Sequence, residues 1–373
     1  MPSRPPTFAA RIKAWQRLHG RRDLPWQATR DPYRIWVSEV MLQQTQVSTV
    51  VPYFERFLAR FPDVSALAAA PADEVMRLWS GLGYYARARN LHRAAQAVVE
   101  RHGGRFPVSV DAVEALPGIG RSTAAAIVAF ATGEPHAILD GNVKRVMARH
   151  FGVAGAVDSA AVLARLWALA EFHVPAKGVE TYTQALMDLG ATVCTRSNPA
   201  CVRCPVRATC VAFRDGRIAE LPGRKPSRVA SARAIAMFAI VSRGEVLVEK
   251  RPSPGIWGGL WSLPEAPPDA DPSEWVGRVF GLRVEAVQAL EPFTHAFTHF
   301  TLDVTPWLVS VKGEAPGARE PFAMWLALQE AQAAALPAPV KRLLARLARA
   351  APSRGASARA GSGAGSRAAR RGR

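Results

Sequence analysis

The feature that most constrains this chain is a tight group of thiols. The four cysteines, Cys194, Cys201, Cys204 and Cys210, form the pattern C-x6-C-x2-C-x5-C, with a proline directly after the third. Thiolates this close in sequence can converge on one inorganic centre without the entropy cost of closing a large loop. Because the rest of the chain has no cysteine, chance clustering of unrelated buried thiols is a poor explanation.

Zinc is the main alternative occupant of these thiols. Structural zinc sites usually pair two short C-x2-4-C arms across a longer gap, whereas this chain has a single C-x2-C arm. We therefore expect an iron–sulfur cluster of the [4Fe-4S] type. Clustered thiols without a disulfide framework also favour a reducing compartment, so we expect a cytoplasmic protein.

The charge of the chain favours a polyanionic partner. The formal net charge is +18, and removing the six arginines between Arg354 and Arg373 still leaves +12. A body this basic favours nucleic acid over acidic protein partners, although high arginine use can also reflect the composition of a genome. The 373 residues are enough for two domains, and 49% hydrophobic residues supply a core for each.

Neither a secretory signal nor a membrane span is apparent in the sequence. Residues 1–15 mix prolines with charges and lack the apolar centre of a signal peptide. No apolar run approaches the ~18 residues that a membrane helix needs. We expect a soluble protein, and a monomer by default.

Two kinds of hydrophobic pattern divide the chain. Residues 8 to about 220 carry helical periodicity, and Asp31 followed by Pro32 predicts the start of a helix that runs over 33–50. Further helices are expected over 64–70, 72–80, 87–101, 110–116, 121–131, 143–151, 159–172 and 180–190. Residues 221–228 break this pattern with proline, glycine and positive charge, which is typical of a linker.

Beyond the linker the pattern predicts a mixed α/β domain. Residues 235–241 and 246–250 flank a Ser-Arg-Gly-Glu turn and predict a hairpin, 297–304 and 307–311 predict strands, and segments from Trp275 and Pro339 predict helices. Residues 351–373 are rich in Ala, Gly, Ser and Arg, which predicts a disordered basic tail. The expected division is 1–221, a linker over 222–233, a domain over 234–350, and the tail.

A glycine-rich corner between two helical segments predicts a phosphate site. The run Leu116-Pro-Gly-Ile-Gly-Arg-Ser-Thr123 allows a tight turn with outward backbone N–H groups at the N-terminus of a helix. An ordinary corner between two helices would have a similar sequence. In a basic chain with clustered thiols, it predicts a helix-hairpin-helix contact to the DNA backbone, which positions the protein without reading bases. The contact residues are Pro117, Gly118, Ile119, Gly120 and Ser122.

Glu39 stands out among the acidic residues because its helical neighbours are mostly apolar. The residues three and four positions away are Trp36, Leu42, Ile35 and Gln43. A carboxyl group on such a face must either bond a buried backbone group, which would make it structural, or carry a raised pKa. Because desolvation favours the protonated form, the second case suits a general acid.

Asp140 ends an apolar run and precedes the helical segment 143–151, so its simplest role is to cap that helix. A carboxylate that stays ionised there could also stabilise a developing cation. Scission of a glycosidic bond needs two carboxyl groups in different environments. One donates a proton, and the other stabilises the positive charge that develops at the sugar. Glu39 and Asp140 together fit such a reaction.

Five motifs in this order resemble the MutY-type adenine DNA glycosylase family over roughly residues 8–350. They are Ser38-Glu-Val-Met-Leu-Gln-Gln-Thr45, Gly81-Leu-Gly-Tyr-Tyr-Ala-Arg-Ala-Arg-Asn90, Leu116-Pro-Gly-Ile-Gly120, Leu139-Asp-Gly-Asn-Val-Lys-Arg145 and the cysteine pattern. The resemblance implies a six-helix barrel, an iron–sulfur domain with a [4Fe-4S] cluster, and a C-terminal Nudix-like α/β domain. It implies base-excision repair of duplex DNA, with removal of adenine mispaired with 8-oxoguanine and with guanine.

The resemblance also assigns roles to single residues. The adenine must leave the stack to be cut, after which Glu39 protonates it and then helps to activate water. Asp140 stabilises the oxocarbenium-like sugar or bonds to it transiently, with Asn142 beside it. The residues that wall or bond the flipped adenine are Leu24, Trp26, Gln27 and Gln184, and those that wedge into the duplex are Gln44 and Tyr84. Apart from the wedge, core packing would explain the same residues.

One position bears on the class of chemistry. Endonuclease III-type relatives carry a Schiff-base lysine in the hairpin motif, where this chain has Ser122. We therefore expect a monofunctional glycosylase, with weak strand cleavage through another amine such as Lys144 left open. An endonuclease III-like pyrimidine glycosylase and a non-catalytic iron–sulfur DNA-binding protein remain alternatives.

The C-terminal half has its own resemblance. Trp257-Gly-Gly-Leu-Trp-Ser-Leu-Pro264 is similar to the start of Nudix hydrolases, but residues 263–282 lack the R-E-x-x-E-E run that holds magnesium. Nucleotide hydrolysis is therefore not expected. Phe297, Thr298 and His299 lie where the family often has the Phe-Ser-His loop that probes 8-oxoguanine. Alternatively, these three are ordinary strand residues.

Overall fold

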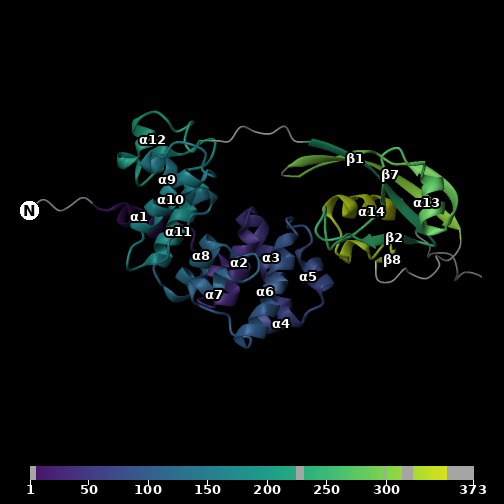
Figure 1. Cartoon of the computed structure of the whole chain (residues 1–373), viewed down its shortest axis with the longest axis horizontal. Helices are drawn as coiled ribbons and strands as arrows, with labels where there is room; N and C mark the ends of the chain where they lie inside the picture. The colour runs from purple at the N-terminus through teal and green to yellow at the C-terminus, as the bar shows by residue number, and fades with distance from the viewer. Residues whose placement is uncertain (1–5, 224–230, 298, 313–321, 351–373) are drawn as a thin grey trace, which may run out of the picture. The chain divides into compact units, whose positions relative to one another are not determined.

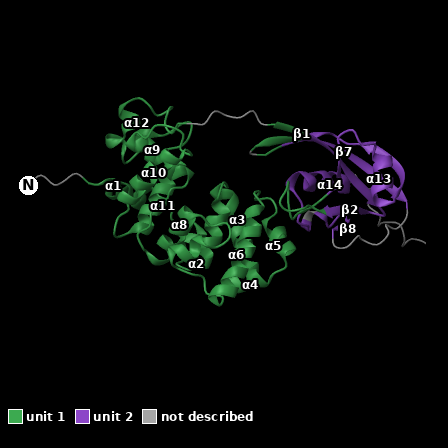
Figure 2. Ribbon diagram, in the orientation of Figure 1, with its two compact units in different colours: residues 1–233, 250–262, 296–302 green, residues 234–249, 263–295, 303–373 purple. Residues whose placement is uncertain are grey.

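The computed structural model describes residues 6–223, 231–297, 299–312 and 322–350. Figure 2 shows that the chain forms two compact units, one of residues 1–233, 250–262 and 296–302 and one of residues 234–249, 263–295 and 303–373. Most of the expected linker, the whole expected tail and Thr298 lie outside the described residues.

Helices build the first unit through residue 214, as the sequence pattern predicts (Figure 1). One group consists of η1 (Pro25–Ala28), α2 (Pro32–Leu42), α3 (Val47–Arg60), α4 (Val64–Ala69), α5 (Ala72–Trp79), α6 (Ala86–His102), α7 (Val110–Glu114) and α8 (Arg121–Thr132). The other consists of α1 (Phe8–His19), α9 (Gly141–Phe151), α10 (Ala160–Phe172), α11 (Val179–Asp188) and α12 (Val211–Arg214), with the short turns η2 (Leu189–Val193), η3 (Cys201–Arg203) and η4 (Arg207–Thr209).

The start of α2 is as expected, but the helix ends earlier than the pattern predicts. The Asp31 carboxylate accepts a hydrogen bond from the backbone N–H of Tyr33 at 2.9 Å, and Pro32 is the first helical residue. The predicted helix over 33–50 is wrong in its second half, because α2 stops at Leu42. Gln44 adopts a left-handed backbone with φ of 56°, and α3 starts separately at Val47.

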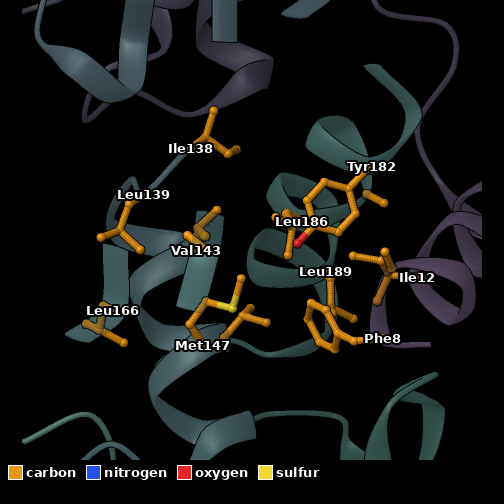
Figure 3. Close-up of a cluster of buried hydrophobic side chains, with 14 of the residues drawn as sticks. Phe8, Ile12, Ile138, Leu139, Val143, Met147, Leu166, Tyr182, Leu186 and Leu189 are labelled. Atoms are coloured by element: carbon orange, nitrogen blue, oxygen red, sulfur yellow. The ribbon is translucent and has the colours of Figure 1, made fainter. Parts of the chain in front are cut away.

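A buried hydrophobic cluster holds the second helix group together. Figure 3 shows side chains from α1, α9, α10 and α11 meeting in it, among them Ile12, Met147, Leu166 and Leu186. Burial of this apolar surface fixes α9 and α11 against each other. The core therefore places the first residues of α9, which follow Asp140, close to α11.

Beyond residue 230 the described residues form a β-sheet and two helices (Figure 1). The strands are β1 (Ser231–Ser242), β2 (Glu245–Lys250), β3 (Trp261–Ser262), β4 (Glu265–Ala266), β5 (Arg283–Ala289), β6 (Phe293–Ala296), β7 (Phe300–Lys312) and β8 (Ala323–Ala327). The pairs β1–β2, β1–β4, β2–β8 and β5–β7 are antiparallel. The order β2-β1-β7-β5 runs through the sheet, with β8 on β2 and β4 on β1. Helices α13 (Pro272–Phe280) and α14 (Ala338–Ala350) complete it, with η5 (Ala331–Ala333), and Val276 of α13 lies in one buried cluster with Phe238 and Val309 of the sheet.

The predicted hairpin is confirmed, and its turn explains its register. Val241 pairs with Val246 and Ser242 with Glu245, leaving Arg243 and Gly244 as a two-residue loop. Both have positive φ, 51° and 89°, as a turn that matches the twist of the strands requires. The predicted strand over 297–304 is wrong at its start, because β7 begins at Phe300 and is continuous with the strand predicted over 307–311.

No helix among the described residues is both long and apolar enough to cross a membrane.

Candidate active site

A cavity of about 640 Å³ in the first unit is lined from α1, η1, α2, α8 and α11. Of the residues predicted to contact the base, Trp26, Gln27, Glu39 and Gln184 line it, whereas Leu24 caps η1 next to them. The other lining residues are Gln16, Arg17, Arg21, Arg22, Thr29, Arg30, Ile35, Ser38, Phe130, Glu180 and Thr181. Its volume is large enough to admit a flipped base.

Glu39 projects from the middle of α2 into this cavity without a polar partner. Its carboxyl group makes no hydrogen bond or ion pair with any residue in the part of the chain that the structure describes. Burial, followed by the charge of Asp140, raises the pKa of Glu39 to about 8. The expected raised pKa is therefore found, and the alternative of a structural bond to buried backbone is not.

Asp140 lies at the N-terminus of α9 and is surrounded by donors. Its carboxylate accepts a hydrogen bond from the backbone N–H of Val143 at 2.8 Å, which confirms the predicted cap. Burial raises the pKa of Asp140, while hydrogen bonds from the Val143 and Asn142 backbone and the charges of Arg145 and Lys144 oppose that rise. The charge of Asp140 contributes to the raised pKa of Glu39, so the two carboxyl groups interact electrostatically.

Asn142 follows Asp140 in the first turn of α9 and is held by Arg145. The Asn142 side-chain oxygen accepts a hydrogen bond from Arg145 Nη2 at 2.8 Å, and the same nitrogen donates to the Gly190 carbonyl at 2.7 Å. Arg145 Nε donates to the Cys194 carbonyl at 2.7 Å. A Cβ added at Gly190 would lie 2.6 Å from the Cβ of Asn142, so only glycine allows this approach.

Ser122, predicted as a DNA contact, makes a structural bond. Its hydroxyl accepts a hydrogen bond from the backbone N–H of Leu139 at 2.9 Å, directly before Asp140. Lys144 lies 3.7 Å from the carboxylate of Asp158, in a weak ion pair.

The cavity walls orient their amides through specific bonds. Trp26 is buried and meets Phe54 edge to face, with ring centroids 5.4 Å apart. Gln27 accepts from the Leu24 backbone at 3.2 Å and donates to the Arg21 carbonyl at 3.2 Å. Both polar atoms of the Gln27 amide therefore have partners within the chain.

Asp188 is a buried acid that the sequence analysis missed. It lies at the end of α11 with 1% of its surface exposed and accepts hydrogen bonds from Gln16, Arg21 and Gln184. Its signal in the sequence was a charged residue in the apolar run Ala185-Leu-Met-Asp-Leu189, four positions after Gln184.

The two predicted wedge residues share an unusual backbone. Gln44 and Tyr84 are exposed non-glycine residues with left-handed φ values of 56° and 48°. Such conformations cost of order 1 kcal/mol or more and persist only where the surroundings hold them.

Arg87, also missed in the sequence, holds both of these loops. Its buried guanidinium donates to the carbonyls of Met41 at 2.8 Å and Val40 at 3.0 Å, and to that of Gln43 at 2.5 Å, at the end of α2. The other guanidinium nitrogen, Nη2, donates to the carbonyl of Gly83 at 3.1 Å, next to Tyr84, and also to the Leu82 carbonyl and the Thr45 hydroxyl. One planar cation thus fixes two segments that are far apart in sequence.

The predicted hairpin forms between α7 and α8. Gly118 has φ of 78°, and a Cβ there would lie 2.6 Å from the Asn90 side chain, so glycine is required twice over. Gly118 and Gly120 are exposed and Pro117 is partly exposed, whereas the Ile119 side chain is buried and anchors the turn. This leaves exposed backbone at the N-terminus of α8, as the sequence predicts.

None of the four cysteines forms a disulfide, and two of them lie against Arg149, which is itself buried. Arg149 Nη1 lies 3.4 Å from Cys194 Sγ, and Cys210 Sγ lies 3.6 Å from the Arg149 carbonyl. Burial, with a smaller contribution from the other three thiols, raises the pKa of Cys204 to about 11. Within the described ranges, no group of three or more His, Cys, Asp or Glu side chains is arranged to hold a single metal ion.

Thiols that raise one another's pKa lie close enough for their charges to interact, so as bare thiolates they would repel. A cationic centre would remove that penalty, and the donor set of four sulfurs suits an iron–sulfur cluster. The cysteines thus fit such a group. Around them, Arg196, Arg203 and Arg207 are exposed.

The predicted lesion loop is described only in part. Phe297 stacks on Phe300 with ring centroids 4.5 Å apart, and its backbone N–H donates to the Phe300 carbonyl at 2.8 Å. His299 is exposed, and Thr298 lies outside the described residues. The loop thus joins β6 to β7, and the alternative that Phe297 and His299 belong to a strand is wrong.

Comparison with protein families agrees with this fold and site. Residues 37–171 match the family profile of the HhH-GPD superfamily base excision DNA repair protein, and residues 236–346 match that of the NUDIX domain. A thermostable thymine-DNA glycosylase of known structure is similar, with a TM-score of 0.51 and 31% identity over 56% of this chain and 95% of that one. The chain is therefore an enzyme of the helix-hairpin-helix DNA glycosylase class.

Curated relatives define the family within that class. An adenine DNA glycosylase of Buchnera aphidicola subsp. Baizongia pistaciae is 34% identical over 91% of this chain and 96% of its own length. The human adenine DNA glycosylase is 32% identical over 87% of this chain and 71% of its own length. The chain belongs to the adenine DNA glycosylase family, which confirms the resemblance read from its motifs.

Proposed function

We propose that this protein hydrolyses the N-glycosidic bond of adenine mispaired with 8-oxoguanine in duplex DNA, and also of adenine opposite guanine. The observation that carries the proposal is a carboxyl group, Glu39, that lines a cavity large enough for a base, has no hydrogen-bond partner among the described residues and has a raised pKa to which the charge of a second carboxyl group, Asp140, contributes. Membership of the adenine DNA glycosylase family supports the choice of base.

Glu39 acts as the general acid. With a pKa of about 8 it is mostly protonated at neutral pH and donates to a ring nitrogen of the purine, which makes the base a better leaving group. After departure the Glu39 carboxylate accepts a proton from the attacking water.

Asp140 stabilises the positive charge that develops on the sugar. Two backbone N–H groups and the nearby charges of Arg145 and Lys144 favour its ionised form against the cost of burial. It stabilises the oxocarbenium-like sugar or bonds to it transiently. Asn142, held by Arg145, lies beside it in the first turn of the helix.

The reaction is monofunctional. Ser122 has no amine to form a Schiff base with the sugar, and its hydroxyl is engaged by the Leu139 N–H. The abasic product therefore stays intact until alkali or another enzyme cleaves the strand.

Duplex DNA contacts several parts of the protein. The hairpin over 117–120, at the N-terminus of α8, binds a phosphate, while Gln44 and Tyr84 enter the duplex as the adenine leaves the stack. Trp26 and Leu24 wall the base, and the loop with Phe297, Thr298 and His299 contacts 8-oxoguanine.

Cys194, Cys201, Cys204 and Cys210 hold a [4Fe-4S] cluster with a structural role. The bound cluster would supply a fixed, charged anchor for the loop that carries Arg196, Arg203 and Arg207, which then face phosphates. Four closely spaced cysteines without a disulfide support a reducing cytoplasm as its compartment. If the protein kept full activity and full DNA affinity after its iron was removed, this structural role would be contradicted. If the cysteines held zinc in place of iron, the purified protein would be colourless.

The proposed division of labour follows the expected domains. Residues 1–221 carry catalysis, 222–233 link, and 234–350 form the Nudix-like domain, which recognises the lesion rather than hydrolysing nucleotides. Its α13 carries Glu274 as its acid and lacks an acidic run. The basic tail follows, and the protein acts as a monomer.

Single-turnover cleavage tests the proposal. Duplexes carrying adenine opposite 8-oxoguanine, adenine opposite guanine, or an oxidised pyrimidine opposite guanine are incubated with and without alkaline work-up. Breakage at adenine that depends on alkali supports the proposal. Breakage without alkali would contradict the monofunctional reaction, breakage at the pyrimidine would move the chain to the endonuclease III type, and no breakage would favour a binding protein.

A further inference from the structure

The Asp188 carboxylate makes more hydrogen bonds than its place at the end of a short helix requires. It accepts from Gln16 Nε2 at 3.0 Å, the Arg21 backbone N–H at 2.9 Å, Arg21 Nε at 2.7 Å and Gln184 Nε2 at 2.9 Å. Arg21 also forms an ion pair with it at 2.5 Å. The charge is thus buried but paired, and its acceptor sites are filled.

This arrangement fixes which end of the Gln184 side-chain amide, the NH₂ group or the oxygen, faces Asp188. A carboxylate offers only acceptors, so the Gln184 amide can approach Asp188 only with its NH₂ group. The carbonyl oxygen of Gln184 is left on the other side, and it accepts no hydrogen bond from the described residues. Because Gln184 lines the cavity, this oxygen is available there as an acceptor.

Glu39 supplies the opposite polarity in the same cavity. Its protonated carboxyl group is a donor, whereas the Gln184 oxygen is an acceptor. Adenine carries an acceptor, N7, beside a donor, its exocyclic amine, while a purine with a carbonyl at position 6 carries two acceptors along that edge. One donor and one acceptor therefore match adenine and mismatch the carbonyl purine.

We propose that Asp188 is a positioning residue that sets base specificity, because it holds the Gln184 amide with its oxygen toward the base. The site then accepts a purine with an amino group at position 6 and rejects one with a carbonyl there. Rejection follows because two acceptors that face each other in the site are both left without a partner. The inference rests on the proposed function and adds the origin of its base specificity.

Three purines placed opposite 8-oxoguanine test this assignment: adenine, hypoxanthine, and purine without a group at position 6. Single-turnover rates are measured for the parent and for Asp188→Asn, in which the new amide can donate and allow the Gln184 amide to reverse. The expected result is a fall in the adenine-to-hypoxanthine rate ratio of about tenfold or more, with the unsubstituted purine least affected. An equal slowing of all three bases would mean a merely structural role and would overturn the inference.

Two further variants tie the effect to Gln184. Gln184→Leu should lower the same ratio, and adding Asp188→Asn to it should bring no further change, because both act through one amide. Thr192→Val removes a hydrogen bond to the backbone carbonyl of Asp188 instead of one to its carboxylate, from a residue outside the cavity lining, and should leave the ratio as it is. Additive losses, or an altered ratio in the Thr192 variant, would contradict the assignment.

Asp188→Glu covers the case in which the asparagine variant does not fold. It keeps an acceptor-only group, so the ratio must be retained even where all rates drop, and a lost ratio would overturn the inference. The parent enzyme separates the two proposals. If it releases no adenine opposite 8-oxoguanine, the proposed function fails; if it does and the ratios above do not move, only the role of Asp188 fails.

Discussion

The middle of α2 and the N-terminus of α9 carry the same chemical group in opposite surroundings. Glu39 on α2 has no hydrogen-bond partner among the described residues, and burial dominates its raised pKa. Burial also raises the pKa of the half-buried Asp140 before α9, but backbone N–H groups and two basic residues oppose that rise. In the proposed mechanism, helix position, rather than the type of acid, thus divides proton donation from charge stabilisation.

Removing the proton donor should have the largest effect. Glu39→Gln keeps the shape of the side chain but cannot transfer a proton, so we expect single-turnover release of adenine to fall by roughly 10³-fold or more. Affinity for the mispaired duplex, measured by fluorescence anisotropy, should change little. A Glu39→Gln rate within tenfold of the parent rate would contradict the role of Glu39 as the proton donor.

Asp140→Asn should lose less activity and almost no stability. Asparagine caps a helix about as well as aspartate, so the thermal midpoint should stay close to that of the parent. The lost charge near the sugar should cost about 10² to 10³-fold in rate. A large drop in the thermal midpoint, or an unchanged rate, would show that the cap is the main role of this residue.

The unpartnered acid should also cost stability in a defined pH window. The folded protein holds the Glu39 proton up to about pH 8, whereas the unfolded chain releases it near pH 4.5. The free energy of unfolding of the parent should therefore fall as the pH rises from 4.5 to about 8, whereas that of Glu39→Gln should not show this fall.

At pH 9 the glutamine variant should be more stable by roughly 5 kcal/mol, because a pKa raised from 4.5 to about 8 costs about 1.4 kcal/mol per pH unit between those values, and the two proteins should be equal near pH 4. Urea unfolding at both pH values measures the difference. Equal stability at pH 9 would mean that Glu39 is not held neutral by burial.

Arg87→Lys should have a smaller effect and act through the wedge loops. A lysine cannot bond both the end of α2 and the loop before α6, so Gln44 and Tyr84 should lose their fixed backbone. We expect about tenfold slower base release, at the level of extruding the adenine. Arg101→Lys, exposed on the same helix, is the control. An unchanged rate of base release in Arg87→Lys would mean that Arg87 does not support the action of the wedge residues.

Most of the fold and part of the site could be predicted because their signals are local. The caps at Asp31 and Asp140, the glycine hairpin and the two-residue turn at Arg243 each depend on residues a few positions apart. The apolar surroundings of Glu39 within its own helix likewise indicated its raised pKa.

What could not be predicted depends on distant contacts. The helix expected over 33–50 ends at Leu42. Arg87, more than forty positions away in sequence, donates hydrogen bonds to the backbone carbonyls at this end. The role of Asp188 depends on Gln16 and Arg21, which are distant in sequence and meet it only through the packing of α1 on α11. Periodicity and motif spacing contain no record of such partners.

The pH dependence of base release tests the central claim most directly. At enzyme concentrations far below saturation, the rate reports the protonation state of the free enzyme. If Glu39 is the buried donor, the rate on adenine opposite 8-oxoguanine should be level near neutral pH and fall about tenfold per pH unit above about 8. A rate that stays constant or rises through pH 9.5 would contradict the account.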